Sequence, residues 1–318
     1  CEHCYQSKDG GPDLNEDLMI QTACGSQNMG VAMFDIEGGE PFMRFPRLLK
    51  LVQALDERSE IWVNTAGAGL KPEMLEQLKK AGLFGLMISI HSPDPGKNDA
   101  FTGIPGSFEI ACNALKLCRQ MNLVGAVNSV LSEDEIRNNG LKKLMDLTRD
   151  LNSDFVQLIH PKPAGLWMGK TKNMQRDSEL IQNIRKEHLH YNSGLSDYPA
   201  LATQVFEESE TALGCTAGGV DRFYVNAYGE IQPCEFLNLS FGNVKDEPLQ
   251  RIFDRMRSYF SVPASDWLCC TQAKAIHELF QQHELKQTPL PWPITKTLVE
   301  KWDRGKPTQL YKTLRIYP

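Results

Sequence analysis

The feature of this sequence that most limits its fold is an alternation, between residues 31 and 159, of short apolar runs with longer amphipathic segments. Short apolar runs bounded by turn residues predict strands, and apolar residues three and four positions apart predict helices. The predicted strands are 31–36, 61–63, 86–91, 124–131 and 155–159, and the predicted helices are 43–55, one that opens at Lys71, 107–121 and 136–151. The strands lack clean alternation of apolar and polar residues, as is usual for parallel strands covered by helices. We therefore expect an α/β fold whose parallel sheet curls into a complete or partial TIM-like barrel.

The alternation stops after residue 160. Residues 166–205 are polar and mixed, with one predicted helix at 178–188, and we expect a bridge there. Short strands at 223–227 and 231–234 flank a turn at Tyr228 and Gly229, which predicts a hairpin in a small α+β domain with a helix at 248–260. The expected domains are the barrel at 1–165, the bridge at 166–205, a cysteine-bearing domain at 206–285 and a C-terminal strap at 286–318. Prolines in the strap predict irregular chain followed by one short helix at 295–302.

Charge and hydropathy exclude two classes of partner. The 318 residues carry 34 basic and 40 acidic side chains, a net charge of −6, so no basic surface is expected for nucleic-acid phosphates or anionic lipid. The longest mostly apolar stretch, 83–90, is eight residues long, far short of the roughly 20 that a membrane-spanning helix needs. We expect neither a nucleic-acid nor a membrane partner.

The nine cysteines are an odd number in a chain large enough to fold without disulfides, and six of them occur in close groups. These groups are Cys1 with Cys4, Cys215 with Cys234, and Cys269 with Cys270. Metal ligation is therefore favoured. The Cys-x-x-Cys at residues 1–4 alone fits a zinc knuckle, a redox pair or an iron–sulfur loop. Cys112 and Cys118, six apart on a predicted helix, are expected to be small core residues.

A glycine-rich loop follows the first predicted strand, at the edge where parallel sheets place their active residues. Gly38 and Gly39 lack a Cβ and so let a ligand approach the backbone, and their carbonyls together with Glu40 offer acceptors to an ammonium group. A purely structural turn is the alternative interpretation.

The Cys-x-x-Cys, the Gly38-Gly39-Glu40 loop, and the segments 88–92 and 103–109 together resemble the radical S-adenosylmethionine (SAM) superfamily. Its members have a Cys-x3-Cys-x2-Cys loop that holds a 4Fe–4S cluster and leaves one iron open for SAM. The resemblance implies that Cys1 and Cys4 are the second and third of these cysteines in a partial (βα)6 barrel. The first cysteine and the first strand are then expected upstream of residue 1, and recruitment of Cys24 is the less favoured alternative.

The same resemblance implies the SAM contacts. Gly38, Gly39 and Glu40 would receive the methionyl ammonium group of SAM, and Ser89 would touch its ribose or carboxylate. Asn128 would meet the same ligand, and His3 takes the place of an aromatic residue that packs on adenine. The alternatives are a capped strand end for Ser89 and an ordinary polar strand residue for Asn128. His91 is expected to be a hydrogen-bonded core histidine.

The second domain resembles the SPASM and twitch domains that follow many radical SAM barrels. Thirteen residues separate Cys215 from Gly229, and four separate Gly229 from Cys234, which is the spacing of their hairpin. The resemblance implies one auxiliary 4Fe–4S cluster held by Cys215, Cys234 and at least one of Cys269 and Cys270. Its fourth ligand is left open between Cys270, an oxygen or nitrogen side chain, and the substrate. A zinc ribbon is the alternative, because the same thiols suit zinc.

By this resemblance the chain is an oxidoreductase or maturase-type enzyme that cleaves SAM reductively to a 5′-deoxyadenosyl radical. The radical would abstract hydrogen from a peptide, protein or small-metabolite substrate, and the auxiliary cluster would assist oxidation or substrate binding. A low-potential donor such as flavodoxin or ferredoxin is implied, and oxygen-sensitive clusters imply a cytoplasmic location. A non-catalytic iron–sulfur or zinc scaffold and methyl transfer by displacement are the alternatives, the latter leaving the cysteines unexplained. No catalytic side chain is assigned.

Overall fold

The computed structural model describes residues 1–6, 11–170, 178–194 and 196–317, and these form two compact units. The first unit comprises Cys1, Ala23–Pro161 and the described residues from 178 to Thr203. The second comprises the described residues of Glu2–Thr22, those from Lys162 to 170, and those from Gln204 to 317. Residues 171–177 and 195 of the predicted bridge lie outside the described residues.

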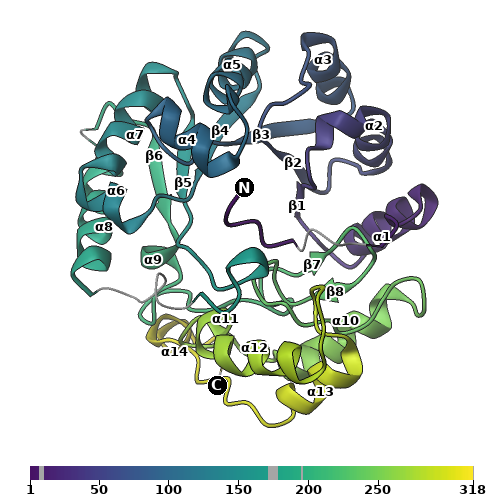
Figure 1. Cartoon of the computed structure of the whole chain (residues 1–318). Coiled ribbons are helices and arrows are strands. Elements are labelled where there is room, and N and C mark those ends of the chain that lie inside the picture. The colour runs from purple at the N-terminus through teal and green to yellow at the C-terminus, as the bar shows by residue number, and fades with distance from the viewer. Residues whose placement is uncertain (7–10, 171–177, 195, 318) are drawn as a thin grey trace. The chain divides into compact units, whose positions relative to one another are not determined.

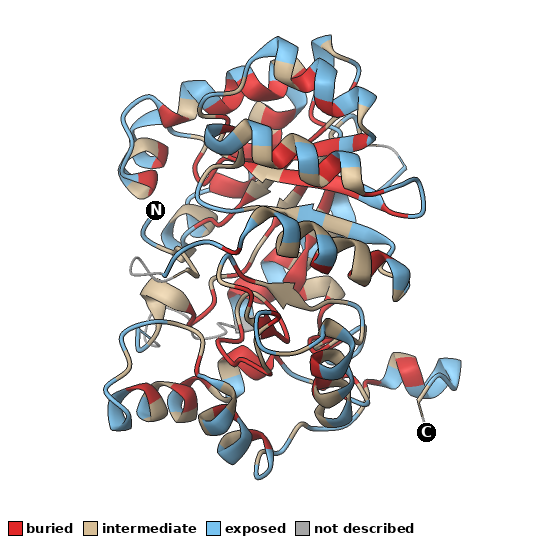
Figure 2. Cartoon of the chain, turned by 90° about the vertical axis from the view of Figure 1, so that its right-hand side faces the viewer, coloured by how far each residue is buried: buried red, intermediate tan, exposed pale blue. Residues whose placement is uncertain are grey.

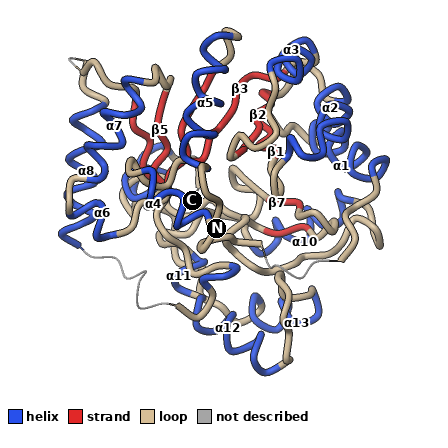
Figure 3. The backbone as a smooth tube through the Cα atoms, turned by 45° about the horizontal axis from the view of Figure 1, so that its top comes forward, coloured by secondary structure: helices blue, strands red, loops and turns tan. Residues whose placement is uncertain are grey.

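Six parallel strands form the sheet of the first unit and follow one another in chain order across it. They are β1 (Met33–Ile36), β2 (Glu60–Thr65), β3 (Leu83–Ser89), β4 (Val124–Ser129), β5 (Phe155–Leu158) and β6 (Ala200–Thr203). Figure 3 shows the strands as an arc with helices around it. The predicted α/β class and partial barrel are confirmed.

Helices connect the strands and lie outside the arc, as α2, α3 and α5 do in Figure 1. The elements are η1 (Pro41–Arg44), α2 (Phe45–Ala54), α3 (Pro72–Lys80), α4 (Pro95–Thr102), α5 (Ser107–Gln120), α6 (Glu133–Arg137), α7 (Gly140–Asp150) and α8 (Ser178–Tyr191). Two helices were not predicted from the sequence, α4 and α1 (Glu16–Asn28), which precedes β1 in the chain.

The single helix predicted at 136–151 is wrong, because the structure has two helices there. A capping box stabilises the start of α6. The Ser132 hydroxyl accepts from the Glu135 amide, and the Glu135 carboxylate accepts from the Ser132 amide. Asn139, between α6 and α7, has φ of +60°, in the left-handed region that a continuous right-handed helix excludes. Asparagine adopts this region more readily than most residues, so the helix breaks at Asn139.

The sixth strand comes from the segment that was expected to be a bridge. β6 pairs in parallel with β5, and helix α8 precedes it with its own contacts to β6. Among the described residues, Ala200–Thr203 is therefore the last strand of the sheet.

The two faces of the sheet differ in what they bury. A Cβ placed on Gly125 would contact Leu115 and Cys118 of α5, so Gly125 faces the helices. Val127, two residues further along β4, lies on the same face. Trp62, Met87 and Ala126 form a buried cluster on the opposite face. Figure 2 shows the buried residues of this unit concentrated in the strands and in the helix faces that meet them.

The second unit is built around a short hairpin. Antiparallel strands β7 (Tyr224–Val225) and β8 (Ile231–Gln232) are joined through the predicted turn, in which Gly229 has φ of +88°. The other elements of the unit are mostly short, and they are η2 (Gly165–Trp167), α9 (Gln204–Glu207), α10 (Leu249–Tyr259), α11 (Leu268–Thr271), α12 (Ala273–Gln282), α13 (Trp292–Val299) and α14 (Gln309–Leu314). The predicted helix at 248–260 is confirmed as α10.

The C-terminal segment has more helix than the sequence analysis predicted. Helix α13 begins at Trp292, three residues before the predicted start, with Pro291 as its N-cap and Pro293 in its first turn. Proline is tolerated there because the first amides of a helix have no intrahelical partner. None of the helices among the described residues is both long enough and apolar enough to cross a membrane.

Candidate functional site

The loop after β1 holds the first group of predicted ligand contacts. Gly38 and Gly39 are open, since a Cβ at either position would meet no described heavy atom within 4 Å. Neither has a positive φ, so glycine provides space here rather than an unusual backbone conformation. A ligand can therefore approach this stretch of backbone without meeting a side chain.

Glu40 has a structural role in the same loop. Its Oε1 accepts from the Thr65 hydroxyl at 2.7 Å and from the Phe42 amide at 3.2 Å, and its Oε2 accepts from the Ala66 amide at 2.9 Å. These bonds tie the loop to the carboxyl end of β2 and cap η1. Both oxygens are already engaged, so Glu40 acts first as a brace that presents Gly38 and Gly39.

A row of polar residues crosses the sheet at the ends of β3, β4 and β5. Ser89 pairs in register with Asn128, and Asn128 pairs with Gln157, so the three residues share one face of the sheet. This is the face of Ala126, opposite the α5 side. Asn128 Oδ1 is buried and accepts no hydrogen bond from any described residue. An unpaired buried amide oxygen is costly, so the row is suited to a polar ligand.

Two polar residues of this face were missed by the sequence analysis. Gln157 extends the row, and Asn64 on β2 has a buried Oδ1 that meets no donor among the described residues, while its Nδ2 donates to Glu37 at 3.2 Å. In the sequence, each of them is a single polar residue within a mostly apolar strand. Such a residue does not indicate a site until the strand register shows which residues lie beside it.

His91 is a core residue, as expected. Its amide donates to Asn98 Oδ1 at 2.8 Å, its Nδ1 accepts from the Val130 amide at 3.3 Å, and its ring lies 5.0 Å from that of Phe101. Only 6% of its surface is exposed.

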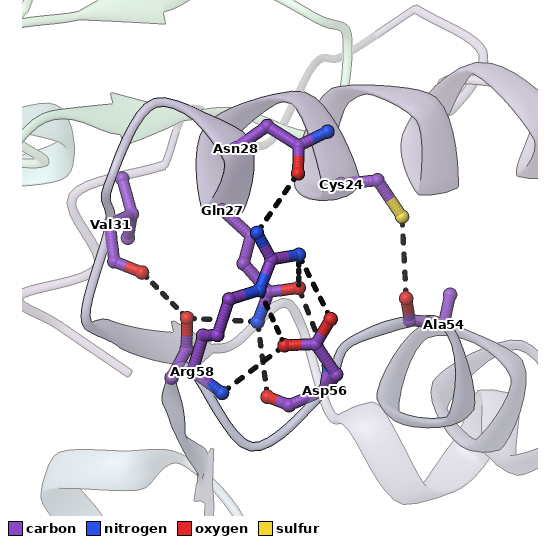
Figure 4. A network of polar contacts seen from close by, with 8 residues as sticks. Cys24, Gln27, Asn28, Val31, Ala54, Asp56 and Arg58 are labelled. Atoms are coloured by element: carbon purple, nitrogen blue, oxygen red, sulfur yellow. Dashed lines mark hydrogen bonds and ion pairs between the residues drawn. The ribbon is translucent and has the colours of Figure 1, made fainter.

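Three cysteines outside the predicted ligand groups have ordinary structural environments. The thiol of Cys24 donates to the Ala54 carbonyl at 3.3 Å, beside the hydrogen-bond network of Gln27, Asp56 and Arg58 (Figure 4). Cys112 and Cys118 are buried in α5, and burial raises the pKa of Cys118 to about 12. Burial thus keeps the thiols of Cys112 and Cys118 protonated at neutral pH, which supports their predicted role as core residues.

The N-terminal Cys-x-x-Cys has two free thiols, that of Cys1 exposed and that of Cys4 half-buried. In the second unit, the backbone carbonyl of Cys4 accepts from the Leu166 amide at 2.9 Å. The His3 ring lies 5.8 Å from that of Trp167, and burial lowers the pKa of His3 to about 4, so its imidazole is neutral at pH 7. Segment 165–167 thus braces the Cys4 backbone, which the sequence analysis did not predict.

The other predicted ligand cysteines lie in the core of the second unit. Cys215 exchanges two backbone hydrogen bonds with Ala264, of 2.8 and 3.0 Å. Cys269 lies on α11, where its thiol is hydrogen-bonded to that of Cys270. The amide of Gly218 donates to the Pro233 carbonyl at 2.8 Å, which ties the Cys215 segment to the one that carries Cys234.

All three of these thiols are held in the protonated form. Burial raises the pKa of Cys215 and, more strongly, that of Cys234, whose thiol donates to Glu235 Oε2 at 3.0 Å. The hydrogen bond with Cys270, together with burial, raises the pKa of Cys269. Two buried thiols and one half-buried thiol, carried by segments of one unit, are the kind of ligands that hold an iron–sulfur cluster once their protons are displaced. The residues present therefore fit an auxiliary iron–sulfur cluster.

Comparison with protein families agrees with these two units. Residues 1–135 match the Radical SAM superfamily, and residues 215–275 match SPASM, an iron–sulfur cluster-binding domain. These two domains imply SAM, a 4Fe–4S cluster and auxiliary iron–sulfur as cofactors.

Individual relatives are distant. An AdoMet-dependent heme synthase of Nitratidesulfovibrio vulgaris is 23% identical over 282 residues, which cover 81% of this chain and 76% of that protein. An AdoMet-dependent heme synthase of Methanosarcina barkeri is 22% identical over 256 residues, covering 71% of this chain and 69% of that protein. Streptococcus suis SuiB, solved with its precursor peptide SuiA, shares the fold with a TM-score of 0.63 at 16% identity over 80% of this chain, which spans 61% of SuiB.

Proposed function

We propose that this chain cleaves SAM reductively and uses the resulting 5′-deoxyadenosyl radical to abstract a hydrogen atom from its substrate. The observation that supports this most is that the half-buried Cys215 and the buried Cys234 and Cys269 lie in a unit that follows a parallel barrel in the chain, within residues that match the SPASM domain. A non-catalytic scaffold would not need the open glycine loop and the unpaired Asn128 oxygen in the barrel.

The proposed roles of the residues follow from their environments. Cys1 and Cys4 are assigned to the SAM-binding cluster, and Gly38 and Gly39 to the methionyl ammonium group of SAM. Ser89 and Asn128 are assigned to its ribose or carboxylate, and the neutral His3 to the adenine side. The bound cluster would supply the low-potential electron of this chemistry. The chain itself orients the cofactor and keeps water away from a radical that attacks most C–H bonds.

In the second unit, Cys215, Cys234 and Cys269 are the proposed ligands of one auxiliary 4Fe–4S cluster. Cys270 follows Cys269 on a single-turn helix, and a hydrogen bond between the two thiols raises the pKa of Cys269. Successive side chains of a helix point in different directions, so Cys270 is assigned a supporting role and the fourth position is left to substrate or another group.

The substrate class is best approached through the curated relatives. Both relatives named above are called heme synthases, so we propose that a heme precursor is tested first and a peptide second. A low-potential donor such as flavodoxin or ferredoxin and a reducing compartment are further parts of the proposal, because 4Fe–4S clusters are sensitive to oxygen.

The first testable prediction concerns SAM cleavage. Anaerobically reduced protein with a full cluster complement should convert SAM to 5′-deoxyadenosine, and Cys4→Ala should abolish this. Cys24→Ala is the matched control, since the Cys24 thiol is hydrogen-bonded to the Ala54 carbonyl, and it should retain cleavage. The product is measured by chromatography.

Three results would count against the proposal. They are S-adenosylhomocysteine as the product, zinc in place of iron in an oxygen-free preparation, and equal 5′-deoxyadenosine yields from Cys4→Ala and the parent. The first indicates simple methyl transfer, the second a zinc scaffold, and the third removes Cys4 from the cluster.

A further inference from the structure

Lys162 is a buried cation that the proposed function has not used. It lies in the second unit with only 5% of its surface exposed, and its ammonium nitrogen has no hydrogen-bond partner among the described residues. The nitrogen lies 2.8 Å from the centroid of the Trp267 ring, which is itself 1% exposed. A buried ammonium is unfavourable unless negative charge or hydrogen bonds compensate it. A tryptophan face compensates only part of that cost.

A second cation of the same unit shows what full compensation looks like. Arg222 pairs with Glu208 and Asp221, each at 3.0 Å, so its charge is neutralised by carboxylates. Among the described residues Lys162 has no such ion pair. The negative charge that compensates Lys162 must therefore come from a group other than the carboxylates of the described residues.

Lys162 contacts the segment that carries a proposed cluster ligand. Trp267, whose ring lies under Lys162, is the N-cap of α11, and Cys269 is the second residue of that helix. The backbone of Cys215 pairs with Ala264, three residues before Trp267. Thiolates of a cluster held at Cys215 and Cys269 would supply the missing negative charge.

We propose that Lys162 is the countercharge of the auxiliary cluster and raises its reduction potential. A thiolate-held cluster is negatively charged and becomes more so when it gains an electron, so a fixed buried cation stabilises the reduced state more than the oxidised one. Lys162 thereby favours acceptance of an electron by this cluster. The inference rests on the proposed function, because it requires a cluster at Cys215, Cys234 and Cys269.

The test is a redox titration followed by electron paramagnetic resonance. It is made in a Cys4→Ala background, so that only the auxiliary cluster contributes to the signal. Lys162→Met and Lys162→Gln remove the charge, and Lys162→Arg retains it. Lys274→Met is the matched control, since this lysine of α12 has 88% of its side chain exposed.

We expect iron and sulfide per chain to remain at the level of the background, and the midpoint potential to become more negative in an uncharged variant. Lys162→Arg and Lys274→Met should keep the potential of the background. Loss of the cluster in both uncharged variants but not in Lys162→Arg would also support a countercharge, because charge alone separates them.

Other outcomes would overturn the inference. An unchanged potential in a fully loaded uncharged variant removes the electrostatic role of Lys162, and cluster loss in all three Lys162 variants indicates a purely steric one. Absence of iron from the Cys4→Ala background itself overturns the auxiliary site, and with it the proposed function of this domain.

Discussion

At the scale of single residues, Gly165 is a position where one methyl group should affect the N-terminal cysteines. Its φ is +54°, and a Cβ there would stand 2.3 Å from the carbonyl oxygen of Cys4. Because the Cys4 carbonyl belongs to the backbone and the Cβ position is fixed, no side-chain rotation relieves the clash. Gly165→Ala should displace Cys4 and lower the iron content of the reconstituted chain by up to about four atoms, as measured by iron and sulfide analysis.

The control for that variant is Gly103→Ala. Gly103 has a comparable φ of +74°, but a Cβ there meets nothing within 4 Å. It should carry the backbone strain of the substitution without the clash, and should load iron normally. Equal iron contents in the two variants would show that the brace at Gly165 does not matter for the N-terminal cluster.

The residues that sequence reasoning missed share a physical reason. Lys162, Asn64 and Gln157 are single polar residues whose neighbours come from distant parts of the chain. Their importance depends on burial and register, which periodicity does not reveal. The cysteines and the glycine loop could be proposed from the sequence because their residue types are informative at fixed spacing, whereas the bracing contacts of Glu40 require the structure.

At the scale of elements, α10 is held by an ion pair in the second unit. Arg255 donates to both carboxylate oxygens of Glu247, at 2.7 and 2.6 Å, and to the Phe241 carbonyl at 2.6 Å, and its guanidinium lies 5.1 Å from the Trp292 ring of α13. Only about a fifth of each charged side chain is exposed. Glu247→Gln should therefore lower the free energy of unfolding by about 1–3 kcal/mol, measured by thermal unfolding under anaerobic conditions.

The control is Glu278→Gln, which breaks an exposed 3.8 Å ion pair with Lys274. It should lower the free energy of unfolding by only roughly a few tenths of a kcal/mol.

The hydrogen bonds from Arg255 lower the pKa of Glu247 from its usual 4.5. Stability from such a depressed pKa is present above the unfolded value and is lost as pH falls through the folded value. The difference between parent and Glu247→Gln should thus be constant near neutrality and shrink below pH 4.5. A difference that grows on acidification contradicts this.

Most elements could be predicted from periodicity, and the exceptions are informative. Strand β6 is short, and two of its four residues are alanine, so its sequence resembles the polar segment around it more than a strand. Its place is set by pairing with β5, a contact that local sequence does not encode. The break between α6 and α7 and the early start of α13 depend on the conformations of Asn139 and Pro293, which tolerate positions that other residues avoid.

At the scale of the whole molecule, the two clusters should be separable by mutation. Cys234→Ala removes a ligand in the second unit and leaves Cys1, Cys4 and the glycine loop unaltered. We expect it to retain SAM cleavage while substrate turnover falls by at least about tenfold, since the two steps depend on different sites. Cleavage and turnover are followed in the same anaerobic assay, with the candidate heme precursor as substrate.

Cys24→Ala serves again as the control and should retain both activities. If Cys234→Ala turned over substrate at the parent's rate, the auxiliary site would have no part in the reaction. If it lost cleavage as fully as Cys4→Ala, the two sites would not be independent.

The protonated state of the buried thiols has a consequence for maturation. The pKa values of the Cys215, Cys234 and Cys269 thiols are all raised, so each thiol must lose its proton when it binds iron. Cluster insertion should then acidify a weakly buffered solution in proportion to the sites filled, and it should proceed faster in mildly alkaline medium.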